Sequence, residues 1–81
     1  MSTFTVTGTV RRVNLEGGRW ALEADDGSRY ELVATSVPPE YLRDGRRGTF
    51  ALQPRPDLMS LGMLGPIVEV LAADGPGRSG S

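Results

Sequence analysis

Apolar and polar residues alternate one by one along much of this chain, and a period of two is typical of β-strands. The first such stretch runs from Phe4 to Val10, with apolar residues or glycine at even positions and threonines at odd ones. Val13 and Leu15 continue the apolar series at odd positions, so we expect one extra residue, a β-bulge, near residues 11–12. The pattern therefore predicts a long first strand that bends at this bulge.

A second alternating stretch covers residues 20–24 and follows a turn that contains two glycines. We expect Leu15 to lie opposite Trp20 across this turn. Val13 then lies opposite Leu22, so that the apolar sides of the two strands coincide.

An acidic turn, Asp25-Asp26-Gly27, leads into a third strand. A two-residue loop would pair Leu22 with Glu31 and mix the two faces of the hairpin, which excludes it. A three-residue loop pairs Leu22 with Tyr30 and places Gly27 where the backbone is left-handed, so we expect this register. The two aspartates also suggest a cation site, but no further ligand follows at the spacing of a calcium loop, and we interpret them as turn residues.

The next segment, residues 36–45, is rich in signals that begin and end a helix. Prolines open it, a glutamate lies in its first turn and a glycine closes it, which predicts one short helical turn. A fourth strand follows with Phe50 and Leu52 on its inner side, and a fifth runs from Ile67 to Ala72.

This order of elements predicts an all-β fold, a small five-stranded OB-like barrel with one short helical turn between strands 3 and 4. In the chief competitor, an SH3-like barrel, the helical turn would fall between the last two strands. We expect the barrel to occupy residues 1–73. Residues 74–81 contain mostly glycine, serine and proline, with nothing apolar to bury, and we interpret them as a disordered tail.

The amino-acid composition limits the kinds of catalytic and metal-binding site that the chain can form. The 81 residues suffice for one small domain, whose core needs most of the large side chains. All nine basic residues are arginine, against ten acidic ones, and there is no histidine, cysteine or lysine. The usual general base, thiol nucleophile, Schiff-base lysine and zinc ligands are therefore missing. We expect a protein that is not an enzyme, with no catalytic residues, no metal site and no cofactor.

The amino terminus lacks the basic start and apolar run of a secretory signal, and the longest nearly apolar stretch, residues 62–68, is far shorter than the ~20 residues of a membrane span. The absence of cysteine agrees with a reducing compartment. These features predict a cytoplasmic protein without a membrane partner.

Several turn and core positions carry a resemblance to known proteins: Gly8, Val10, Val13, Leu15–Gly18, Trp20, Leu22, Asp25–Gly27, Tyr30, Leu32, Met59, Ser60, Gly65, Pro66 and Val68–Val70. In these positions the chain resembles a set of small, uncharacterised bacterial proteins with OB-fold-like β-barrels. The resemblance covers residues 8–70 and implies the fold and little activity. Some of these proteins carry cysteines where this chain has Arg19 and Gly62, so the resemblance implies that these two positions lie near each other, here without a disulfide.

OB barrels bind oligonucleotides or oligosaccharides on the face of strands 2 and 3, which is one candidate function. Trp20 and Tyr30 lie on the right strands, but their alternation puts them with Leu22 on the apolar side, so we expect them in the core. Acidic residues are interspersed with the arginines and the isoelectric point is near 5.2, which makes nucleic acid the disfavoured partner. The candidate ligand contacts in this alternative are Arg11, Arg12 and Arg55.

The segment between the last two strands is unusually apolar for a loop. Its large side chains are Leu58, Met59, Leu61, Met63 and Leu64. Such residues at the rim of a barrel either cover the open end of the core or form a contact surface, and both interpretations stay open. We interpret this segment, together with Leu15 and Arg19, as a candidate surface for a protein partner or for a second copy of the chain.

Overall fold

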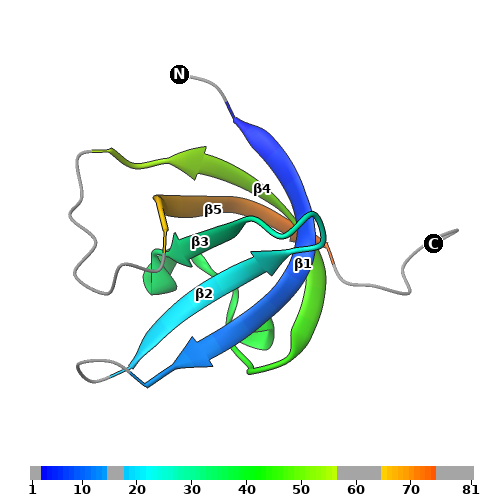
Figure 1. Cartoon of the computed structure of the whole chain (residues 1–81), viewed down its shortest axis with the longest axis vertical. Coiled ribbons are helices and arrows are strands. Elements are labelled where there is room, and N and C mark those ends of the chain that lie inside the picture. The colour runs from blue at the N-terminus through cyan, green and yellow to red at the C-terminus, as the bar shows by residue number, and fades with distance from the viewer. Residues whose placement is uncertain (1–2, 15–17, 57–64, 75–81) are drawn as a thin grey trace, which may run out of the picture.

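A computed structural model of the chain describes residues 3–14, 18–56 and 65–74 and shows five strands in one closed barrel (Figure 1). The strands are β1 (Phe4–Val13), β2 (Arg19–Ala24), β3 (Arg29–Leu32), β4 (Arg46–Pro54) and β5 (Ile67–Asp74). They are ordered β1-β2-β3-β5-β4, with β4 pairing back onto β1, and only β3 and β5 run parallel. This is the topology of an OB barrel, and it confirms the predicted fold class.

Two short 3₁₀ helices connect β3 to β4, where the sequence predicted one helical turn. They are η1 (Ala34–Ser36) and η2 (Pro39–Tyr41), and Pro39 opens the second, as expected of a proline at a first helical position. Val37 and Pro38, each followed by a proline, have extended backbones with ψ of 128° and 140°. A residue before proline disfavours the helical region, so the proline pair divides the segment in two.

The barrel interior is filled by apolar side chains from all five strands and from the β3–β4 connection. Its buried members are Val10, Leu22, Leu32, Val37, Tyr41, Phe50, Leu52, Val68 and Val70. Tyr41 packs its ring edge-on against Phe50, with centroids 5.4 Å apart, so that η2 covers one end of the barrel. Phe4, Trp20 and Tyr30 are partly buried and pack against this core, as the alternation predicted.

β1 differs from the prediction because it contains no bulge between Phe4 and Val13. It pairs without interruption with β4 through Phe4–Val10 and with β2 through Gly8–Val13. The expected pairs across the first turn are wrong as well: Trp20 lies opposite Arg12, and Leu22 lies opposite Val10. The strand leaves the core after Val10, and residues 11 and 12 are both exposed, so the change of apolar phase needs no extra residue.

Gly8 allows β1 to pass closely over β2. A Cβ atom added at this buried glycine would collide with the carbonyl oxygen of Glu23. The close approach falls within residues 8–10, the part of β1 that pairs with β2 and β4 at once. Gly8, and not the predicted bulge, thus allows β1 to pair with both β2 and β4.

The β2–β3 hairpin has the predicted register. Leu22 lies opposite Tyr30, and the Ala24 N–H donates to the Ser28 carbonyl over 2.8 Å, which leaves a three-residue loop. Gly27 ends that loop with a φ of 94°, the left-handed conformation that glycine adopts without strain.

A bulge does occur in β5, where the sequence did not predict one. Leu52 pairs with Val70 and Ala51 with Ala72, which leaves Leu71 without an opposite residue on β4. Leu71 is 49% exposed, and the shift returns Ala73 to the core side.

Some backbone groups at the strand edges form hydrogen bonds with residues of the β3–β4 connection and not with another strand. The Ser36 hydroxyl accepts from the Val70 N–H over 2.9 Å and donates to the Val33 carbonyl over 2.6 Å. On the opposite side, the Gly45 N–H donates to the Val10 carbonyl over 2.7 Å. These groups are consequently not available for pairing with an added strand.

We expect Gly8→Ala to destabilise the barrel by about 3 kcal/mol, because the added methyl group forces β1 and β2 apart. Urea unfolding followed by circular dichroism measures the change. Thr5→Ala, at an exposed position of the same strand, is the matched control and should change the free energy of unfolding far less. Equal losses for the two variants would contradict the role given to Gly8.

Candidate functional site

The outer face of β1, β2 and β3 is the surface on which OB barrels bind ligands, and here it is highly charged. The outward side chains form rows across the strands: Thr9 lies opposite Glu23, and Glu23 opposite Arg29. In the next row, Arg11 lies opposite Ala21, which lies opposite Glu31. Charges of opposite sign therefore meet on neighbouring strands.

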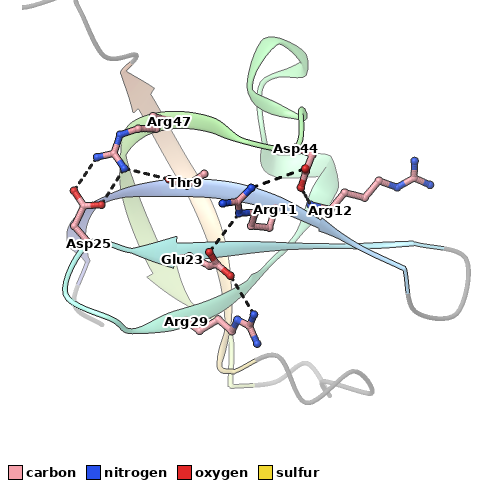
Figure 2. A network of polar contacts seen from close by, with 8 residues as sticks. All are labelled: Thr9, Arg11, Arg12, Glu23, Asp25, Arg29, Asp44 and Arg47. Atoms are coloured by element: carbon pink, nitrogen blue, oxygen red, sulfur yellow. Dashed lines mark hydrogen bonds and ion pairs between the residues drawn. The ribbon is translucent and has the colours of Figure 1, made fainter.

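Glu23 lies at the centre of an ion-pair ladder that spans three strands (Figure 2). One carboxylate oxygen accepts from Arg11 Nε over 3.3 Å and the other from Arg29 Nη2 over 3.1 Å. The hydrogen bond from Arg29, and then that from Arg11, lower the pKa of the Glu23 carboxyl. Glu23 thus pairs with two arginines, on β1 and β3, and Arg11 also lies 3.9 Å from a carboxylate oxygen of Asp44.

Arg47 extends the ladder to β4. Its two terminal nitrogens donate to the Asp25 oxygens over 3.0 and 2.8 Å, and one of them also donates to the Thr9 hydroxyl over 3.1 Å. The hydrogen bonds with Arg47 lower the pKa of Asp25, and the same contact raises the pKa of Arg47. This bidentate pair ties the β2–β3 turn to a strand that is distant in sequence.

Asp26 serves the turn itself. Its carboxylate accepts from the Ser28 N–H over 2.8 Å, and this backbone hydrogen bond lowers the pKa of Asp26. Both aspartates are thus engaged within the fold, in agreement with their interpretation as turn residues. Among the residues that the structure describes, no group of three or more acidic, histidine or cysteine side chains is placed to hold a metal ion.

Glu31 is buried, although it occupies an outward position in β3. Only 5% of its side chain is exposed, and an oxygen accepts from Arg19 Nη1 over 3.0 Å. Its cross-strand neighbours are Ala21 on β2, which is fully buried, and Ile67 on β5. Alternation within one strand gives no information about these neighbours, so the sequence could not reveal this pair.

The two aromatic residues of β2 and β3, Trp20 and Tyr30, do not lie on the charged outer face. They follow the inward phase of Leu22 and pack against the core. The outer positions of β1–β3 within the described ranges carry no aromatic ring, so base stacking has no platform there.

The three arginines predicted as ligand contacts are not brought together. Arg11 follows Val10, which lies opposite Arg46 at the start of β4, whereas Arg55 follows Pro54 at the other end of β4 and hydrogen-bonds to the β5 residue Ile67. Arg11 is paired with Glu23, and Arg55 with Glu69 over 2.8 Å. Arg12 has no ion pair within the described part of the chain.

The predicted partner surface falls largely outside the described residues. Leu15 and the whole apolar segment, residues 58–64, belong to the parts of the chain that the structure leaves undescribed, and so does Gly62. Arg19 is described, and the structure assigns it to the pair with Glu31.

Two open hollows border the β2–β3 turn and coincide with none of the predicted sites. The larger, about 420 Å³, is lined by Glu23, Ala24, Gly27, Ser28 and Arg29. The smaller, about 240 Å³, lies between this turn and residues 5–7 of β1. Their linings are turn backbone and ladder side chains, without an aromatic ring or a buried polar group that would fix a ligand.

The ladder predicts a loss of stability in acid. The pKa values of Glu23, Asp25 and Asp26 are lower in the fold than in the unfolded chain, so their contribution is complete above about pH 5. It is lost as the pH falls through the lower, folded values. We expect Tm to fall over this range in wild type and to fall less in Asp25→Asn. Glu40→Gln is the control, since exposed Glu40 makes no ion pair within the described residues, and it should retain the wild-type pH profile.

Removing Arg19 should destabilise the fold more than removing Arg29. Arg19→Met leaves the buried Glu31 carboxylate without this donor and should reduce the free energy of unfolding by about 2 kcal/mol. Arg29→Met is the matched control, because Glu23 is 40% exposed and keeps its contact with Arg11. Denaturant unfolding checks both variants, and a loss in Arg19→Met no larger than in Arg29→Met would contradict the structural role of the buried pair.

The described part of the chain contains no helix with the length and apolarity to cross a membrane. Its charged side chains mostly pair with one another across the outer face of the barrel. Comparison of the chain with models of protein families, with curated proteins and with solved structures gives no match.

Proposed function

We propose that this protein is a small, non-enzymatic β-barrel interaction module, which binds a protein partner or a second copy of itself through the apolar segment 58–64. In this proposal it works in the bacterial cytoplasm, and Leu15 and Arg19 contribute to the same surface. Flexible apolar side chains such as methionine and leucine suit surfaces that adapt to a protein partner.

One observation carries the proposal: the described residues on both sides of the apolar segment are fastened to the barrel. The Arg55 N–H donates to the Ile67 carbonyl over 2.9 Å, which joins the end of β4 to the start of β5. The Glu31 N–H donates to the Pro66 carbonyl over 2.9 Å, which joins the residue before β5 to β3. Five large apolar residues are therefore inserted between two anchored points of a rigid sheet.

The charged residues beside these anchors support a contact surface of mixed character. Arg55 pairs with Glu69 on β5, and Glu31 pairs with Arg19 on β2. Polar and charged residues commonly surround the apolar centre of a protein interface. Arg19 consequently supports the proposed surface as part of its polar border.

The alternative, binding of an oligonucleotide or oligosaccharide on the β2–β3 face, has less support. The arginines of this face are in ion pairs with Glu23 and Glu31, and its aromatic residues pack against the core. Trp20 fluorescence during titration with an oligonucleotide or oligosaccharide tests this alternative, since a ligand stacked on this face would change the emission of the partly buried Trp20.

Sedimentation velocity over a range of concentrations tests the proposal, with pull-down from a lysate as a second measurement. We expect wild type to self-associate or to retain a protein, and Met63→Asp to lose that association, because a carboxylate is costly to bury in an apolar contact. Leu71→Asp is the matched control: it places the same charge at an exposed leucine of β5 and should behave as wild type. Monomers throughout, with no retained protein, would contradict the proposal, as would equal losses in both variants.

A further inference from the structure

The arginines within the described residues divide into two groups according to their partners. Those in ion pairs are Arg11, Arg19, Arg29, Arg47 and Arg55. Arg12, Arg43 and Arg46 have no carboxylate partner among the residues that the structure describes. Figure 2 shows the contrast, since Arg12 points away from the ladder while Arg11, Arg29 and Arg47 turn toward carboxylates.

The backbones of these three arginines lie close together at one corner of the barrel, although they come from two distant parts of the chain, and the Arg12 side chain extends from there toward Gly18. A tight turn joins Arg43 to Arg46, whose N–H donates to the Arg43 carbonyl over 3.1 Å. The Asp44 side chain in this turn accepts from the Arg12 N–H over 2.9 Å, and Arg46 lies opposite Val10 of β1. We call Arg12, Arg43 and Arg46 the basic corner.

Arg46 is held in this corner by an aromatic ring. Its guanidinium carbon lies 4.6 Å from the centroid of the Tyr41 ring, a cation–π contact that positions the side chain without neutralising it. Its Nε is buried and has no hydrogen-bond acceptor. A guanidinium that has lost part of its water and has no counter-ion attracts an anion more strongly than a fully solvated one.

Trp20 lies next to this group. It is opposite Arg12 in the β1–β2 ladder and is only partly buried. Arginine, tyrosine and tryptophan are the residue types that contribute most at protein interfaces. The basic corner, with the partly exposed Trp20, therefore has the composition of a protein-binding site, while the buried Tyr41 holds Arg46 in place.

We propose that the basic corner binds an acidic segment of a protein partner. The proposal rests on the proposed function as a protein-binding module and names the chemistry of the partner. Carboxylates suit arginine because the planar guanidinium binds both oxygens at once. Arg12 and Arg43 are exposed and Arg46 is held by Tyr41, so that carboxylates spaced along a short segment can each pair with an arginine.

A protein segment fits this corner better than a nucleic acid. The corner consists of three arginines beside Glu40 and Asp44, so its positive charge covers a short patch and not an extended stripe. Nucleic-acid-binding domains present extended basic stripes and usually a basic isoelectric point, whereas this chain has a net charge of −1. A short acidic peptide needs only the local excess of positive charge.

Fluorescence anisotropy of a labelled decaglutamate peptide at low ionic strength tests this inference on the full chain. Arg12→Gln/Arg43→Gln leaves the stacked Arg46 in place and should weaken binding about tenfold or more. Arg29→Gln/Arg47→Gln removes the same charge from the ladder and should weaken binding less than about twofold. Dispersed NMR spectra confirm that both variants fold, and the Trp20 indole signal of wild type should shift when the peptide is added.

Three results would overturn the inference: no binding of the peptide to wild type, equal weakening by the two double variants, or tighter binding of a decathymidylate oligonucleotide than of the peptide. The last result would assign the corner to nucleic acid. The sedimentation of Met63→Asp is independent of these measurements. If the peptide does not bind while Met63→Asp still abolishes association, the proposed function stands and the basic corner has no part in it.

Discussion

Closure of the barrel depends on one strand that pairs with two neighbours. β1 contacts β4 through Phe4–Val10 and β2 through Gly8–Val13, and at the overlap Gly8 lies against the backbone of β2. Without this close approach the sheet would remain open, and Val10 and Phe50 would lose their enclosed positions. The other features follow from closure, because it brings β4 beside β1 and places Arg47 within reach of Asp25.

Features determined by neighbours in sequence were predictable, and features that join distant parts of the chain were not. The alternation around Leu22 and Tyr30 determined the β2–β3 register, since a slip of one residue would reverse both faces. The order of elements was enough to identify the OB topology. We expected the bulge in β1, but it occurs in β5. The change of apolar phase after Val10 has another cause, which is that β1 leaves the core at this point. A pattern of apolar positions does not distinguish these causes.

The candidate sites show the same division. The turn role of Asp26 was predictable from its place before a glycine. The burial of Glu31 was not, since it depends on residues supplied by β2 and β5. Arginines that look equivalent in sequence differ in the fold: Arg11 forms an ion pair with Glu23, while its neighbour Arg12 has no ion pair in the described chain. Net charge thus describes the whole chain correctly and conceals a local excess of positive charge.

The hydrogen bonds between Arg55 and Ile67 and between Glu31 and Pro66 have a consequence for how such a protein can diversify. They hold the ends of β3, β4 and β5 together independently of the sequence inserted between β4 and β5. Doubling the length of such an insertion adds only about 0.6 kcal/mol of closure entropy. Insertions and substitutions between β4 and β5 can therefore change partner specificity without changing the residues that stabilise the barrel. This connection is thus a suitable position at which to insert a new binding sequence.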